Sequence, residues 1–271
     1  MAWGCFSIVP CPYKKWDENA RNHMLFSLPL IGLLIGCCWF GIFVLLKNIG
    51  APAMVSAVIL AILPQLLSGF IHMDGYMDCC DAICSRRDLA ERQRILKDSH
   101  VGAFAVIGLV IWALFSFAAA CDITLSDKVT LWDATPLILI PVFSRGLSVL
   151  KIWTVPPLST SQYAKSQKDG NKTETDDVKE LGAKNKNTDN RSKLKIILAF
   201  PLIAFILIFA LIIFFKCLNP WLMAIILIEN LAHMIVCDRA IKNLGGMSGD
   251  ISGFAITISE TAAIITMAFL V

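Results

Sequence analysis

Long apolar stretches separated by short polar segments dominate this sequence. A helix needs roughly 20 apolar residues to cross a hydrocarbon core of about 30 Å. Stretches of about that length lie at 25–46, 51–69, 101–120, 132–150, 194–215, 220–237 and 251–270. The second contains Pro52 and Pro64, and the fourth contains Pro136, Pro141 and Arg145, so we expect these two helices to be kinked. The pattern predicts an all-α fold, a polytopic integral membrane helical bundle of about seven transmembrane spans.

Composition agrees with a lipid environment for most of the chain. Of the 271 residues, 56% are hydrophobic and only 17% are charged, whereas roughly a quarter of the residues in a soluble domain are charged. We therefore expect a single membrane domain over residues 1–271, with the lipid bilayer as its partner and no nucleic-acid partner. The sequence leaves a homo-oligomer open. Within the domain, the polar stretch from about 160 to 193 is expected to be a flexible loop.

Lysine and arginine residues are concentrated in alternate connecting segments. Most of the 24 share one side of the membrane if the N-terminus is cytosolic, and only Lys47, Lys128 and Lys216 fall on the other. Cytosolic segments of membrane proteins carry such an excess of positive charge. The distribution predicts a cytosolic N-terminus and a multi-pass protein of the cell membrane. It also places segments 70–100 and 238–250 on the cytosolic side.

An acidic cluster, HMDGYMDCCDA, follows directly on the second apolar stretch. If this segment is helical, Asp74, Asp78 and Asp81 occupy positions i, i+4 and i+7 on one face. Three neighbouring carboxylates repel one another unless a cation lies among them, and Mg²⁺ prefers carboxylate oxygens and keeps positions free for phosphate. We expect a magnesium site here. The alternative is a solvated acidic face, which the apolar residues between the aspartates make less attractive.

The ten cysteines favour free thiols over disulfides, because the chain is neither small nor secreted and several cysteines fall in or beside the predicted spans. A zinc site built from His72, Cys80 and Cys84 lacks a second pair of cysteines at ligand spacing.

A basic segment, ERQRILKDSHVGAF, precedes the third apolar stretch. Positive groups beside a carboxylate-bound metal suit a substrate that carries a pyrophosphate. The positive charge of cytosolic segments explains Arg92 and Arg94 equally well, whereas Lys97, Asp98 and Ser99, directly at the span, favour a functional role.

The third motif, LGGMSGDISGF, precedes the last apolar stretch. Gly245 and Gly246 permit tight turns, and Ser248 or Asp250 is suited to cap the last helix, whose N-terminus attracts anions. A plain turn that begins a helix is the alternative.

Polar residues inside the apolar stretches should face a polar interior, because they are costly in lipid. These are Arg145, Glu229, Asn230, His233 and Glu260.

These motifs, in this order, resemble the cobalamin synthase family of adenosylcobinamide-GDP ribazoletransferases. The resemblance rests on SGFIHMDGYMDCCDAICS, ILKDSHVGAF, PVFSR, NLGGMSGDISGF with the glutamate of ISETAA, and FSIVPCPYKKW near the N-terminus. Two positions depart from the family pattern, which usually has glycine in place of Ala82 and arginine in place of His100.

The resemblance implies a magnesium-dependent transfer in which α-ribazole, or its 5′-phosphate, attacks adenosylcobinamide-GDP and GMP leaves, as in the assembly of the vitamin B12 nucleotide loop. The active site would face the cytosol. The implied metal ligands are Asp74, Asp78 and Asp81. The implied catalytic residues are these three with His72, Lys97 and Asp98, where His72 is a candidate general base. The implied substrate or phosphate contacts are Ser99, Arg145, Gly245, Gly246, Ser248 and Asp250.

Two other functions fit parts of the pattern. A CDP-alcohol phosphotransferase that forms lipids also uses clustered aspartates, but that family has an alanine-arginine pair soon after its Asp-Gly, and the segment from Asp74 to Asp78 lacks it. A secondary transporter would explain broken helices and intramembrane charges, but it would place its acidic residues near the bilayer midplane.

Overall fold

The structure, a computed structural model, describes residues 2–11, 24–126, 129–158 and 221–270. The predicted loop at 160–193 and the apolar stretch at 194–215 lie outside these ranges. The described residues form helices, with one isolated bridge between Pro157 and Met247. The helices are α1 Ala2–Phe6, the 3-10 helix η1 Met24–Ser27, α3 Leu28–Asn48, α4 Ala53–Leu67, α5 Ile71–Cys84, α6 Leu89–Ile95, α7 Ala103–Leu125, α8 Pro136–Thr154, α11 Leu222–Leu244 and α12 Gly249–Leu270.

The predicted all-α membrane fold is confirmed. Four helical segments in the described ranges are long and apolar enough to span a membrane: Met24–Asn48, α7, α8 and α12. A fifth is obtained if α4 and α5 together count as one bent span. Helix α11 forms where 220–237 was predicted, but it is not among these segments. The total of seven spans and the cytosolic N-terminus stay predictions.

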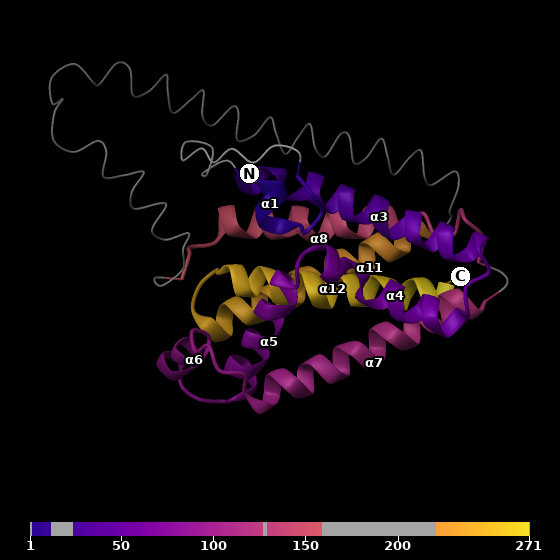
Figure 1. Ribbon diagram of the computed structural model, residues 1–271. Helices are drawn as coiled ribbons and strands as arrows, with labels where there is room; N and C mark the ends of the chain where they lie inside the picture. The colour runs from indigo at the N-terminus through magenta and orange to yellow at the C-terminus, as the bar shows by residue number, and fades with distance from the viewer. Residues whose placement is uncertain (1, 12–23, 127–128, 159–220, 271) are drawn as a thin grey trace, which may run out of the picture.

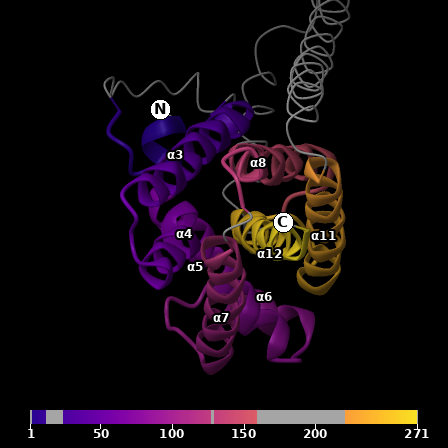
Figure 2. The same ribbon diagram turned by 90° about the vertical axis from the view of Figure 1, so that its right-hand side faces the viewer.

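Helix α12 lies at the centre of the bundle. It packs against α5, α7, α8 and α11, which surround it when the bundle is viewed along its length (Figure 2). The remaining long helices form an outer layer, in which α3 packs on α8 and α4 packs on α7. The acidic helix α5 and the starts of α7 and α12 gather at one end of the bundle (Figure 1). The two predicted catalytic segments therefore share one end.

The expected kink of the second apolar stretch takes the form of a sharp bend. Pro64 lies in the last turn of α4, and α5 then leaves at 91° to α4. Gly69 and Phe70 in the connection both adopt left-handed backbone conformations, with φ of 65° and 60°. In α8, by contrast, the helix continues through Pro141 without a break.

Backbone contact fixes the position of α3 against α8. A Cβ atom added to Gly32 would lie 2.2 Å from the carbonyl oxygen of Pro141, and one added to Gly36 would lie 2.1 Å from that of Ile138. Helices in membranes approach this closely where small residues line the contact. The two glycines thus set the spacing between α3 and α8.

We predict that Gly36→Leu lowers the thermal unfolding midpoint of the detergent-solubilised protein, because the new side chain must force α3 away from α8. Overpacking of this kind costs about 1–3 kcal/mol. Gly41→Leu is the matched control on the same helix, since a Cβ there meets nothing within 4 Å. If both variants unfold at the same temperature, the backbone contact does not hold α3 in place.

Candidate active site

The acidic face of α5 lies at one end of the bundle (Figure 1). Asp74 is exposed, and Asp78 and Asp81 are partly exposed, whereas Met73, just before Asp74, and Tyr76 are buried. The helix predicted for this segment is confirmed over Ile71–Cys84. The aspartates therefore lie on the more exposed face of α5, while the buried apolar residues attach the helix to the protein.

A fourth carboxylate reaches this face from α12. A Cβ added to Gly75 would lie 2.7 Å from the Cα atom of Asp250, so the backbones of α5 and α12 touch where the acidic cluster begins. Asp250 stands in the first turn of α12. It adds negative charge beside Asp74 and Asp78.

The carboxylates repel one another strongly enough to affect protonation. Partial burial raises the pKa of Asp78 to about 7, and the charges of Asp74, Asp250 and Asp81 contribute to the shift in that order. Asp78 is thus at the centre of the negative charge. Clustered carboxylates of this kind attract cations, and strongly shifted pKa values are common at functional sites.

Asp81 connects α5 to the start of α7. Its Oδ2 atom accepts a hydrogen bond from the N–H of Gly102 at 2.6 Å, and its Oδ1 atom accepts one from the N–H of Ala105 at 2.9 Å. The carboxylate caps the first turn of α7, where free N–H groups attract negative charge. The segment that precedes α7 is therefore held at the acidic face.

That segment carries the predicted residues Lys97, Asp98 and Ser99, all of them exposed. Asp98 accepts a hydrogen bond from the backbone N–H of His100 and pairs with its ring Nδ1 at 2.7 Å. These hydrogen bonds lower the pKa of the Asp98 carboxyl. Asp98 consequently has a partner within its own turn, while the Lys97 ammonium stands in solvent.

The glycine motif builds the turn between α11 and α12. Gly245 ends α11 with φ of 85°, a conformation that favours glycine. A Cβ on Gly246 would lie 2.9 Å from the backbone nitrogen of Leu158, so the turn packs against the chain leaving α8. The Ser248 hydroxyl accepts a hydrogen bond from the N–H of Ile251 at 3.3 Å. Of the two predicted caps for the last helix, Ser248 is the one that caps it.

Helix α6 joins the basic segment to this turn. Arg92 donates to the side-chain oxygen of Asn243 at 2.7 Å, and Gln93 donates to the carbonyl oxygen of Leu244 at 2.8 Å. Arg94 instead pairs with Glu91 on the surface. The two arginines thus have partners within the protein. The contacts to Asn243 and Leu244 join residues far apart in the sequence, and no local pattern predicted them.

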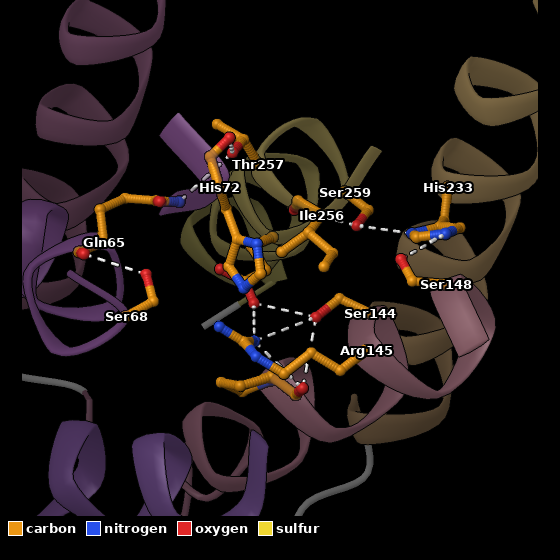
Figure 3. Close-up of polar contacts among 12 residues, drawn as sticks. Gln65, Ser68, His72, Ser144, Arg145, Ser148, His233, Ile256, Thr257 and Ser259 are labelled. Carbon is orange, nitrogen blue, oxygen red and sulfur yellow. Dashed lines mark hydrogen bonds and ion pairs between the residues drawn. The ribbon is translucent and has the colours of Figure 1, made fainter. Parts of the chain in front are cut away.

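Two predicted site residues lie elsewhere. Arg145 is fully buried and forms an ion pair with Glu260 at 2.6 Å, with Ser144 bonded to the same carboxylate oxygen at 2.9 Å. His72 is buried as well, and its ring lies near Ser144 and Arg145 (Figure 3). Both side chains belong to the polar interior rather than to the acidic face.

That polar interior was expected from the sequence. Arg145, Glu229, His233 and Glu260 are all buried between α8, α11 and α12, and His233 lies between the hydroxyls of Ser148 and Ser259 (Figure 3). The prediction that these residues avoid lipid is confirmed, while Asn230 is only half-buried.

The donor chemistry of the acidic face suits a hard divalent cation, since it consists of carboxylate oxygens. Within the part of the chain that the structure describes, no three His, Cys, Asp or Glu side chains converge on a common point as metal ligands. The magnesium site on Asp74, Asp78 and Asp81 stays a prediction. The cysteines of the described ranges are free, in agreement with the sequence.

Comparison with known proteins covers nearly the whole chain. The family model described as cobalamin-5-phosphate synthase matches residues 1–268. A protein of Clostridium perfringens (strain 13 / Type A), named adenosylcobinamide-GDP ribazoletransferase, is 33% identical over 267 residues, which are 98% of this chain and 95% of that protein. A protein of the same name from Clostridium botulinum (strain Alaska E43 / Type E3) is 31% identical over 261 residues, 96% of this chain and 92% of that protein. No solved structure matches the chain.

We predict that Asp81→Ala loosens the start of α7, because it removes the acceptors for the N–H groups of Gly102 and Ala105. Loss of a helix cap costs about 0.5–2 kcal/mol, so amide hydrogen exchange in peptides covering 101–106 should accelerate about 2- to 30-fold. Asp122→Ala, at the exposed far end of the same helix, should leave these amides unchanged. Unchanged exchange in Asp81→Ala would show that the cap does not form in solution.

We also predict a pH dependence of stability in the metal-free protein. The pKa of Asp78 is about 7 in the folded state, against an ordinary value of 3.8, so between these values the folded state holds a proton that the unfolded state has released. Stability should therefore fall as the pH rises from about 4 to about 7. Asp78→Asn should flatten this decline and unfold at a higher temperature than the parent protein at pH 8.

The measurement is thermal unfolding in detergent with EDTA at a series of pH values. Asp122→Asn serves as the control, and its profile should match that of the parent protein. Parallel profiles for the parent protein and Asp78→Asn would contradict the raised pKa of Asp78.

Proposed function

Because this chain belongs to the cobalamin-5-phosphate synthase family, we propose that it is a membrane-embedded adenosylcobinamide-GDP ribazoletransferase. The observation that carries the proposal is the match to the family over residues 1–268, which includes each of the three motifs. The protein is a transferase with several membrane-spanning helices. Its substrates would be adenosylcobinamide-GDP and α-ribazole or its 5′-phosphate.

The proposed reaction replaces a phosphoanhydride bond of adenosylcobinamide-GDP by a phosphate ester bond to α-ribazole. A hydroxyl of α-ribazole attacks the phosphorus on the corrinoid side of the pyrophosphate. The bond from that phosphorus to the bridging oxygen breaks, and GMP leaves with the bridging oxygen while the proton of the hydroxyl passes to solvent. A transfer of this kind asks the protein chiefly to position both substrates and to balance negative charge.

We propose that the acidic face holds Mg²⁺ through Asp74, Asp78 and Asp250. The supporting observations are the exposure of Asp74, the approach of α12 to α5 at Gly75, and the raised pKa of Asp78, which results first from partial burial and then from the neighbouring carboxylates. When bound, the ion would offset the charge of the pyrophosphate. The carboxylate of Asp81 already caps α7, so its main contribution would be to fix the geometry of the site.

The surrounding residues would act on the substrate or on the shape of the site. Lys97, exposed beside the start of α7, would offset the charge on departing GMP. His72 is turned toward Arg145 in the interior, so we assign it a positioning role in α5 rather than the role of general base. Arg145, paired with Glu260, would hold α8 to α12.

The location of the acidic face favours this reaction over transport. Helix α5 lies toward one end of the bundle (Figure 1). Its residue Asp74 is exposed, so a nucleotide can reach it from water. A transporter would keep its acidic residues near the middle of its helices. We further propose that this end faces the cytosol in the cell membrane, as the distribution of lysine and arginine predicts.

We predict that purified protein in detergent converts adenosylcobinamide-GDP and α-ribazole to cobalamin and GMP only when Mg²⁺ is present. Asp78→Asn should reduce the rate at least about 100-fold, because a central carboxylate of the site is lost. Chromatography of both products, with and without EDTA, measures the reaction. Asp122→Asn is the matched control and should retain full activity.

A second readout separates metal binding from catalysis. Added Mg²⁺ should raise the unfolding temperature of the parent protein at pH 8 but not that of Asp78→Asn. If folded parent protein with intact substrates makes neither product, the reaction assignment fails, whatever the metal does. If Mg²⁺ stabilises both proteins equally, the acidic face is not the metal site.

A further inference from the structure

A cavity that the proposed reaction does not use lies at the opposite end of the bundle. Its volume is about 220 Å³, and it is formed where the end of α3, the start of α4 and the end of α7 meet, far from the acidic face in Figure 1. Buried apolar side chains form part of its wall, namely Phe43, Leu60 and Ile123. The cavity is far larger than the roughly 10–15 Å³ that one water molecule needs.

One wall of the cavity carries a cation. Lys47, in the last turn of α3, donates a hydrogen bond to the carbonyl oxygen of Val129, and its ammonium lies 5.9 Å from the centre of the Phe43 ring. An ammonium has three N–H donors, so two remain after the bond to Val129. Among the residues that the structure describes, no carboxylate pairs with Lys47. The cavity therefore has a positive charge available to a ligand.

The N-terminus of α4 faces the same cavity and lacks a side-chain cap. Pro52 occupies the N-cap position and makes no capping hydrogen bond, while Ala53, the first helical residue, lines the cavity. The first N–H groups of a helix have no partner within the helix and carry partial positive charge. They add to the attraction that Lys47 exerts on an anion.

A serine of α4 also lines the cavity. Ser56 is only 5% exposed and lines the cavity, yet its hydroxyl forms no hydrogen bond with any described residue. A serine hydroxyl can both donate and accept a hydrogen bond. This unpaired hydroxyl on a buried residue is a second observation, besides Lys47, that favours a polar ligand in the cavity.

The surroundings of the cavity indicate which kind of anion fits. Exposed apolar side chains continue from its rim along the outer surface of the bundle, with Val55 and Val58 on α4 and Leu125 on α7 at 46–53% exposure. Such a surface in a membrane protein faces acyl chains. A ligand with a phosphate group and two acyl chains would match the cation, the helix end and the apolar surface together.

We propose that this cavity binds the headgroup of an anionic phospholipid, with Lys47, Ser56 and the first turn of α4 around its phosphate. The acyl chains would lie on the exposed apolar side chains of α4. A zwitterionic headgroup would bring its own cation close to Lys47 and should bind more weakly. One bound lipid would then contact the end of α3, the start of α4 and the end of α7. This binding is independent of the transfer reaction.

The test is native mass spectrometry of the full chain in detergent micelles, titrated with phosphatidylglycerol or with phosphatidylcholine of the same acyl chains. We expect phosphatidylglycerol to bind more tightly. Lys47→Gln should weaken its binding about fivefold, the effect of one positive charge near a lipid surface, and Lys47→Arg should retain it. Lys242→Gln removes one exposed lysine from the last turn of another long helix and is the control for charge alone.

Ala51→Phe tests the cavity without removing charge, because the ring would occupy the space that Ala51 lines. It should also weaken the binding of phosphatidylglycerol, in protein that elutes as the parent does on size exclusion. Equal binding of the two lipids by the parent protein, or unchanged binding in both Lys47→Gln and Ala51→Phe, would overturn the proposal. Thermal stabilisation by inorganic phosphate equal to that by phosphatidylglycerol would overturn the assignment to a lipid.

Discussion

The close crossing of α5 and α12 is the contact on which the site depends. Gly75 on one helix and Gly253 on the other let the two backbones touch, since a Cβ on Gly253 would lie 2.7 Å from the carbonyl oxygen of His72. This contact brings Asp250 to the aspartates of α5, although the two segments are far apart in the sequence. It also fixes the direction in which Asp81 reaches α7. A larger residue at either glycine would push the helices apart and move Asp250 away from the aspartates of α5.

Charged groups inside the bundle give α12 a defined position relative to its other neighbours. The ion pair between Arg145 and Glu260 joins α8 to α12 in the interior. A buried pair of this kind adds little net stability over apolar residues, but the loss of one partner leaves an uncompensated charge, which is costly. Any shift of α8 along α12 would break the pair. The interior charges therefore favour a single register of these helices.

Much of the architecture could be predicted from the sequence, because lipid imposes a strong and simple pattern. The apolar stretches became α3, α4, α7, α8, α11 and α12, and the i, i+4, i+7 spacing placed the aspartates on one face of α5. The contacts between helices could not be predicted from the sequence in the same way. The role of Asp81 as the cap of α7 and the burial of His72 depend on the direction of α5 after the bend.

The sequence also suggested Arg145 as a substrate contact, because an arginine in an apolar stretch signals a function or a partner. Its partner Glu260 was recognised as another polar residue of the interior, but nothing local indicated that the two would pair. Pairing across a bundle depends on helix rotation and register, which single stretches do not specify.

The bend after α4 explains how a membrane helix can carry an acidic active site. A continuous helix over residues 53–84 would be roughly 48 Å long and would carry the aspartates away from the bundle into water. The 91° bend instead lays α5 against α12, with Met73 and Tyr76 buried and Asp74 exposed. The left-handed conformations of Gly69 and Phe70 make the turn possible within three residues. The apolar half of α5 thus holds its carboxylates at the edge of the bundle, where they are partly shielded from water and their mutual repulsion remains strong.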